Sequence, residues 1–215
     1  MIKNIIFDFD GTLADSLNLF IKIYNEIHKS CACPSFDIRD KDRLRDLSVA
    51  EILKEYQISA FKVPILAFKA KRKLGNKLNE LELFPGIKEA LQDLKNRGYS
   101  LHVLSSNSKS NLIAFLKQEE ILTLFSSVYG GASLFSKARK IKKLFKREGI
   151  NSQNSLYIGD EIREIEACRN ISLPIISVTW GFNSKQSLEK LNHNMIVDSI
   201  IELLNRIYEN TSSDS

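Results

Sequence analysis

Residues 5–12 read Ile5-Ile6-Phe7-Asp8-Phe9-Asp10-Gly11-Thr12, an apolar run that ends in two acids and a glycine turn. A short continuous apolar run is typical of a strand buried on both faces of a parallel sheet. Alternation along the strand points the Asp8 and Asp10 side chains to one side, at the carboxyl end, where open α/β sheets bind ligands. Two like charges held together are costly and a divalent cation offsets their repulsion, so the pattern predicts a Mg²⁺ site. The simpler interpretation is a polar turn after a strand.

The segment that follows this strand is expected to be helical. Apolar residues recur at helical spacing from Leu17 to Ile27, and helical patterns continue through 43–56 and 62–82. No convincing strand is found between Asp15 and Phe84, and the turn pair Pro85-Gly86 ends the block. We therefore predict an all-helical cap domain, residues 15–85, inserted into the core after its first strand.

Strands and helices alternate after this block. The expected helices are 87–96, 111–119, 137–147, 162–169 and 199–208, and the expected strands are 100–104, 125–129, 155–158 and 174–178. This order predicts an α/β fold with a Rossmann-like parallel sheet. We expect residues 1–14 and 86–209 to form the discontinuous core, and the polar residues 210–215 to form a disordered tail.

The composition is that of an ordinary globular protein. The chain has 215 residues, of which 43% are hydrophobic and 27% charged, which excludes collagen-like and disulfide-scaffold classes. No stretch approaches the roughly 18 apolar residues that a membrane span needs, so no membrane partner is expected. The three cysteines are an odd number, and the acids Asp8 and Asp10 interrupt the start where a signal peptide would be apolar. These features predict a cytoplasmic protein with free thiols.

The positive charge is concentrated in two places. The formal net charge is +5, yet residues 62–77 hold six basic and no acidic side chains, and residues 137–148 hold seven basic and one acidic. The rest of the chain is therefore net acidic. Clustered basic residues suggest an anionic partner, either a nucleic acid or a small phosphorylated compound. In 137–148 an apolar helical face accompanies the basic residues, so most of them are expected on its solvated side.

The longer string Phe7-Asp8-Phe9-Asp10-Gly11-Thr12-Leu13-Ala14-Asp15-Ser16 closely resembles the first motif of the haloacid dehalogenase superfamily of phosphohydrolases. The resemblance implies three further motifs in fixed order. A serine at the end of the strand 100–104 fits the second, and we prefer Ser106, followed by Asn107, over Ser105. Ser136-Lys137 fits the third, with Lys137 opening a helix. Gly159-Asp160-Glu161, with Glu164 where the family commonly has aspartate, fits the fourth. The tripeptide Trp180-Gly181-Phe182, after the last expected strand, also resembles sequences of the phosphoglycolate phosphatase branch.

The resemblance also implies roles for these residues. Asp8 would be the nucleophile that forms an aspartyl-phosphate intermediate, and Asp10 the general acid and base. Mg²⁺ would be held by Asp8, Asp160 and the backbone carbonyl of Asp10. Ser106 and Asn107 would hold phosphoryl oxygens, and Lys137 would neutralise developing charge. Glu161 and Glu164 would orient metal-bound waters.

Two alternatives remain open from the sequence. A sugar phosphomutase of the β-phosphoglucomutase type shares the chemistry of Asp8 and Asp10, whereas a dehalogenase lacks the second acid and is disfavoured. A mutase would differ in the cap, where the stretch Leu44–Ser48 resembles a substrate-specificity loop and Arg45 is a candidate ligand for a second anionic group. A basic nucleic-acid-binding protein is the alternative of another class, but no recognisable nucleic-acid motif accompanies the basic segments. We expect a magnesium-dependent phosphatase of small phosphate monoesters, as a monomer or homodimer.

Overall fold

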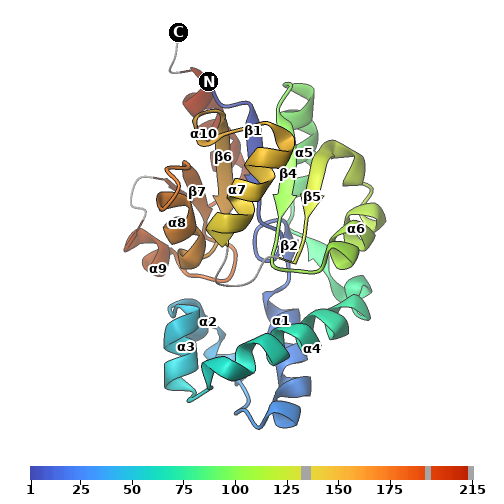
Figure 1. Cartoon of the computed structure of the whole chain (residues 1–215), viewed down its shortest axis with the longest axis vertical. Helices are drawn as coiled ribbons and strands as arrows, with labels where there is room; N and C mark the ends of the chain where they lie inside the picture. The colour runs from blue at the N-terminus through green and yellow to red at the C-terminus, as the bar shows by residue number, and fades with distance from the viewer. Residues whose placement is uncertain (132–136, 192–194, 213–215) are drawn as a thin grey trace.

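The protein has a three-layer α/β core and a helical cap, as Figure 1 shows for a computed structural model. The structure describes residues 1–131, 137–191 and 195–212. Six parallel strands form the sheet in the order β5-β4-β1-β6-β7-β8. They are β1 (Asn4–Phe7), β4 (Ser100–Leu104), β5 (Phe125–Tyr129), β6 (Ser155–Gly159), β7 (Ile175–Val178) and β8 (Ile196–Val197). The predicted fold class is thereby confirmed.

Helices cover both faces of this sheet because each strand alternates its apolar side chains between them. Ile5 and Phe7 of β1 pack on one face with α5, α6 and α10, whereas Ile6 packs on the other with α7 and α8. The core helices are α5 (Ile87–Asn96), α6 (Lys109–Gln118), α7 (Lys137–Glu148), α8 (Ile162–Arg169), α9 (Lys185–Glu189) and α10 (Ile200–Ser212). All of β1 is buried, which explains its uninterrupted apolar sequence.

The cap lies below the sheet in Figure 1 and is built from four helices. They are α1 (Leu17–Ile27), α2 (Lys41–Arg45), α3 (Val49–Glu55) and α4 (Val63–Gly75). A small hydrophobic core, which includes Ile27, Ile58 and Leu66, joins α1, α3 and α4. Short 3₁₀ turns complete the chain at His28–Cys31, Ile38–Asp40, Ala60–Lys62, Leu78–Glu80, Leu122–Leu124 and Ser152–Asn154.

Several details differ from the sequence-based expectations, among them the helix expected over 62–82, which ends at Gly75. Two short strands, β2 (Ala14–Asp15) and β3 (Glu82–Leu83), pair antiparallel where the two connections to the cap run side by side. The prediction that no strand lies between Asp15 and Phe84 is therefore wrong. Two residues are too few for an alternating pattern to show. The pattern at 43–56 is two helices, broken before the capping box of Ser48 and Glu51. The short elements α9 and β8 were not anticipated.

The carboxyl-terminal helix is longer than expected. We expected it to end at Tyr208 and residues 210–215 to be disordered, but α10 continues to Ser212, and residues 213–215 lie outside the described residues. Cys31, Cys33 and Cys168 are free thiols, as expected. Within residues 1–131, 137–191 and 195–212, no helix combines the length and apolar character needed to cross a membrane.

Candidate active site

The loop after β1 is a tight turn built around one backbone carbonyl. The amides of Thr12, Leu13 and Ala14 all donate to the carbonyl oxygen of Phe9, at 3.0–3.3 Å. Gly11 has φ +81°, and a Cβ atom there would lie 2.2 Å from Asp160 Oδ2. A side chain at this position would therefore be strained and would also clash with the neighbouring acid. Glycine allows the loop to approach Asp160 closely.

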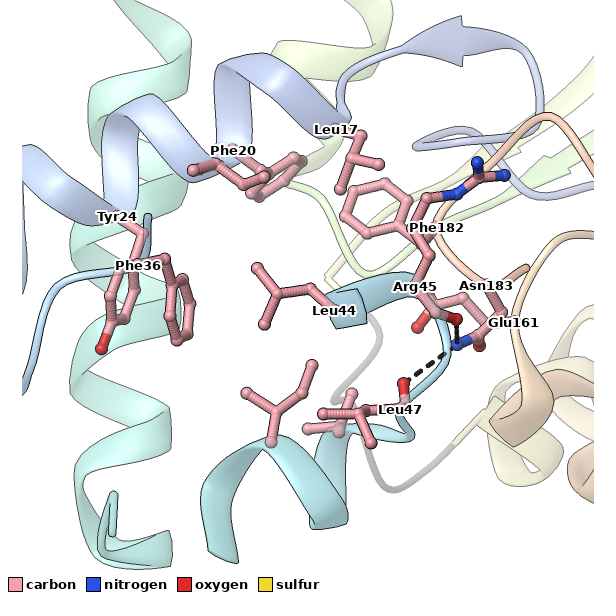
Figure 2. A pocket seen from close by; sticks show the side chains of 13 residues that line it. Leu17, Phe20, Tyr24, Phe36, Leu44, Arg45, Leu47, Glu161, Phe182 and Asn183 are labelled. Carbon is pink, nitrogen blue, oxygen red and sulfur yellow. Dashed lines mark hydrogen bonds between the residues drawn. The ribbon is translucent and has the colours of Figure 1, made fainter. Parts of the chain in front are cut away.

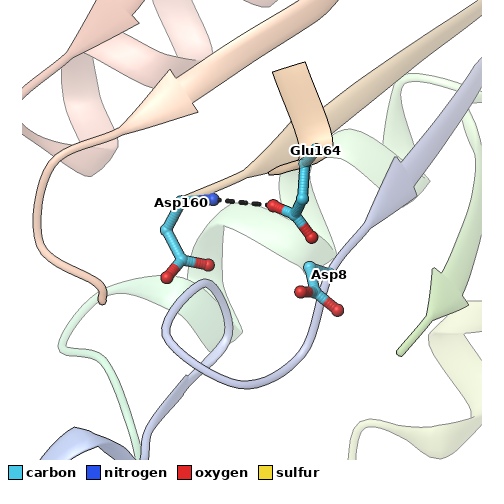
Figure 3. A group of neighbouring side chains, drawn as sticks. All are labelled: Asp8, Asp160 and Glu164. Atoms are coloured by element: carbon cyan, nitrogen blue, oxygen red, sulfur yellow. Dashed lines mark hydrogen bonds between the residues drawn. The ribbon is translucent and has the colours of Figure 1, made fainter. Parts of the chain in front are cut away.

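Three buried carboxylates meet beside this loop. Oxygen atoms of Asp8, Asp160 and Glu164 all lie within 4.8 Å of one another, and Figure 3 shows them gathered at the ends of β1 and β6. These strands are neighbours in the sheet, so the residues that follow them share one edge. The Asp160 oxygens accept hydrogen bonds from Thr12 Oγ1, at 2.6 Å, and from the Phe182 amide, at 2.7 Å.

Lys137 neutralises part of this charge. Its ammonium lies 2.9 Å from Asp8 Oδ2 and also contacts Glu164 Oε1, and its side chain is only 2% exposed. Burial lowers the pKa of Lys137, but the two carboxylates more than offset this and hold it above the ordinary value. Burial raises the pKa of Asp8, with Lys137 acting in the opposite direction. Ser136, which precedes Lys137 in the proposed motif, lies outside the described residues.

Glu164 is held by protein groups on both oxygens. Oε2 accepts hydrogen bonds from the amides of Asp160, at 3.0 Å, and Glu161, at 3.3 Å, while Oε1 accepts from the Tyr157 hydroxyl at 3.2 Å. A Cβ atom on Gly159 would come within 2.0 Å of Oε2, so the glycine makes room for the longer side chain. Burial and the charge of Asp8 raise the pKa of Glu164 to about 7.

The second acid of the loop has different surroundings. Asp10 accepts hydrogen bonds from Ser105 Oγ, at 3.3 Å, and from Asn107 Nδ2, at 3.4 Å. Burial raises the pKa of Asp10 to about 6, although these two hydrogen bonds act to lower it. The partner of Asp10 is thus Ser105, which is fully buried, whereas Ser106 is half-buried and lines a cavity beside it.

The remaining predicted site residues, Arg45 and Glu161, lie where the cap meets the core. Arg45 donates to the carbonyl oxygens of Gly181, at 3.0 Å, and Thr179, at 2.6 Å, and so joins the cap to the core. Figure 2 shows Asn183 next to this contact, where its amide donates to the carbonyls of Arg45 and Leu47. Glu161 forms an ion pair with Arg163. The contacts of Arg45 and Asn183 were not predictable from the motifs, because they depend on how the cap packs on the core.

Several cavities open between the cap and the core, and two of them lie against α1. The one drawn in Figure 2 is lined mainly by apolar side chains of the cap, together with Arg45, Glu161 and Phe182. The second, which we call the chamber, is lined by Asp10, Lys71, Ser106 and Asn107 and otherwise by apolar and aromatic side chains. The two cavities share Phe20 and Tyr24 of α1. Asp10 therefore lines a partly open cavity in which a small organic group can bind.

The acidic cluster has the chemistry of a site for a hard divalent cation. All its donors are carboxylate oxygens, which Mg²⁺ prefers. Asp8 Oδ1 is buried and has no hydrogen-bond partner among the described residues, a costly arrangement that a bound cation would relieve. Burial and the nearby acids Glu164 and Glu161 raise the pKa of Asp160 well above its ordinary value, which a cation would reverse.

Comparisons with known proteins agree with this site. Residues 5–178 match the family model for haloacid dehalogenase-like hydrolases. The chain is 38% identical over 203 residues to a phosphoglycolate phosphatase of Synechococcus elongatus, covering 94% of this chain and 96% of that protein. A crystal structure of a predicted phosphatase from Clostridium acetobutylicum has the same fold, with a TM-score of 0.84 at 23% identity, over 97% of this chain and 99% of that one.

The family follows from the fold, the four motifs and these matches together. The chain belongs to the haloacid dehalogenase-like hydrolases, as the resemblance implied. Within that family it is a phosphatase, since it keeps the second acid, Asp10, and is similar along nearly its whole length to a phosphatase.

Sequence reasoning missed several residues of the site. Thr12 and the Phe182 amide hold Asp160, yet Phe182 was noted only as part of a family-like tripeptide. Thr12 lies inside the first motif, so its hydroxyl was available as a signal. Lys71 was one of several basic residues in the cap, and its place in the chamber depends on packing between segments far apart in the chain.

Proposed function

We propose that this protein hydrolyses small phosphate monoesters, with 2-phosphoglycolate as the first candidate substrate, through a covalent intermediate on Asp8. The observation that carries the proposal is the contrast between two neighbouring acids. Burial raises the pKa of both acids, but Asp8 has a cation, the Lys137 ammonium, 2.9 Å from its carboxylate to oppose this shift, whereas Asp10, with a pKa of about 6, has the neutral hydrogen-bond partners Ser105 and Asn107. A nucleophile needs the first environment and a general acid the second.

The first step forms the covalent intermediate. The Asp8 carboxylate attacks phosphorus as the bond to the leaving oxygen breaks, and Asp10 gives its proton to that oxygen. Lys137 neutralises charge on the phosphoryl oxygens as a fixed cation. We assign the phosphate-binding serine to Ser105 rather than Ser106, because its hydroxyl is buried against Asp10. Asn107, buried beside it, would donate to a phosphoryl oxygen or hold Asp10.

The second step returns the protein to its starting state. Asp10, now ionised, takes a proton from a water molecule as that water attacks phosphorus, and the bond between phosphorus and Asp8 breaks. Inorganic phosphate leaves and the Asp8 carboxylate is restored. Mg²⁺, held by Asp8, Asp160 and the Asp10 carbonyl, would neutralise phosphate charge throughout. Glu164 would act by holding Lys137 and the backbone of Asp160, rather than by orienting metal-bound water.

The cap has a separate role in the proposal. Residues 15–85 would move as a unit against the core formed by 1–14 and 86–209, and closure would exclude bulk water from the intermediate. The hydrogen bonds from Arg45 to the carbonyls of Gly181 and Thr179 support this closed arrangement. We therefore propose that Arg45 joins the cap to the core and does not bind the substrate. The cytoplasmic location and the monomeric or homodimeric state also belong to this proposal.

The test is initial-rate phosphate release from a panel of phosphate monoesters, with and without Mg²⁺. We expect 2-phosphoglycolate to rank first and release to depend on the metal. A phosphomutase would instead convert a sugar phosphate to its isomer with little release. Release from none of the esters would refute the phosphatase assignment. Nucleic-acid affinity that falls steeply with salt concentration would instead support the alternative function, a basic nucleic-acid-binding protein.

A further inference from the structure

The basic segment of the cap, residues 62–77, is mostly occupied with contacts inside the cap. Lys62 donates to the Ala32 carbonyl and Lys69 to Ser30, while Lys73 and Lys77 both pair with Glu26. Arg72 is exposed on α4. Lys71 is the remaining basic residue of the segment, and it differs from the others in its surroundings.

The Lys71 side chain lines the chamber with Asp10, Ser106 and Asn107. Its ammonium makes no hydrogen bond or ion pair with any residue that the structure describes, and Lys71 is the only cation among the described residues lining this cavity of about 220 Å³. Burial lowers the pKa of Lys71, while the charge of Asp10 acts to raise it. Lys71 is half-buried and has no ion-pair partner among the described residues, so its ammonium is available to an anionic group that enters this mostly apolar cavity.

A chain of hydrogen bonds fixes α4 at this point. Asn111 Nδ2 donates to the backbone carbonyl of Lys71, at 2.9 Å, and to Asn107 Oδ1, at 3.1 Å. Asn107 in turn donates to Asp10, at 3.4 Å. A Cβ atom on Gly75 would lie 2.9 Å from Asn111 Oδ1, so the helix approaches closely here. The backbone that carries Lys71 is therefore positioned relative to the general acid.

We propose that Lys71 binds a carboxylate on the alcohol part of the substrate, an inference that rests on the proposed phosphatase function. Lys137 lies against Asp8 and serves the phosphoryl group, whereas Asp10 must face the leaving oxygen. The chamber beside Asp10 is thus on the leaving-group side, and Lys71 is its only cation within the described lining. Lys71 would select alcohols that carry an acid over neutral alcohols of the same size.

The experiment compares 2-phosphoglycolate with its neutral amide, 2-phosphoglycolamide, which keeps the shape and removes the second charge. For Lys71→Met we expect kcat/KM for 2-phosphoglycolate to fall about 10- to 100-fold, mainly through KM, the size of a charge-assisted hydrogen bond. For the amide we expect a change within about threefold. Lys71→Arg should restore part of the loss, because it keeps the charge.

Arg72→Met is the matched control, since it removes one charge from the same helix at an exposed position. It should leave kcat/KM within about threefold of the wild type for both esters. Equal loss for the acid and the amide in Lys71→Met, or no loss for either, would overturn the assignment while the phosphatase function stands. A wild type that hydrolyses neither ester, nor any other monoester, would instead refute the proposed function itself.

Discussion

Replacing Lys137 with methionine should destabilise the protein strongly. The ammonium lies between Asp8 and Glu164, and the three side chains are 2%, 3% and 0% exposed. Methionine fills a similar volume but leaves two buried carboxylates facing each other, with Asp160 close by. Breaking a buried ion pair by removing one partner costs about 3–5 kcal/mol, because the remaining charge is uncompensated. We expect the free energy of unfolding of Lys137→Met, at pH 8 without metal, to fall by that amount.

The loss should depend on pH with a definite sign. In the wild type the pKa of Glu164 is raised to about 7 by burial and by Asp8, while Lys137 lowers it. Without the lysine, that pKa rises further, so the folded variant binds a proton that the unfolded chain releases. A raised carboxyl pKa means that stability is greatest at low pH and is lost as pH rises through the folded value. The deficit should therefore be smaller at pH 6 than at pH 8.

Urea unfolding followed by circular dichroism, in the presence of a chelator, measures both effects. Glu164→Gln in the Lys137→Met background removes one of the stranded charges, so the double variant should be more stable than Lys137→Met alone. A deficit below about 1 kcal/mol would refute the reasoning, since that is the range of exposed ion pairs. So would a deficit that stays constant from pH 6 to pH 8.

Two further predictions concern the other side of the site. Ser105→Ala should lower kcat/KM for 2-phosphoglycolate about 10- to 100-fold, while Ser106→Ala stays within about threefold; the reverse order in steady-state kinetics would return the role to Ser106. Burial raises the pKa of Asp10 from 3.8 to about 6, so the metal-free wild type loses stability as pH rises from about 4 to 7. Asp10→Asn has no such group, so its free energy of unfolding should increase relative to that of the wild type over this range, by at most about 3 kcal/mol. Chemical denaturation at several pH values checks this, and a pH-independent difference between the two proteins would contradict it.

Long periodic segments were the predictable part of this fold. Residues 87–96, 100–104, 125–129 and 162–169 have the predicted bounds, because each has a clear apolar period or a turn at its end. The pair β2 and β3 could not be found in the same way, because its two-residue strands are held by pairing between distant segments. Local sequence carries little information about such contacts.

The acids of the site were predictable because they follow strands that are neighbours in the sheet. Asp8 and Asp160 lie together, as the order of motifs implied. The choice between Ser105 and Ser106 could not be made from the sequence, since adjacent side chains at a strand end point in different directions. Lys71 was also out of reach, because a helical pattern shows which residues share a face but not what that face contacts.

The most direct test of the proposed mechanism is the rate of phosphate release from 2-phosphoglycolate by Asp8→Asn with saturating Mg²⁺. Circular dichroism should first establish that the variant is folded. Asparagine keeps the size of Asp8 but cannot act as the nucleophile, so we expect release at least about 10⁴-fold slower than in the wild type. A folded variant that releases phosphate at the wild-type rate would contradict the role of Asp8.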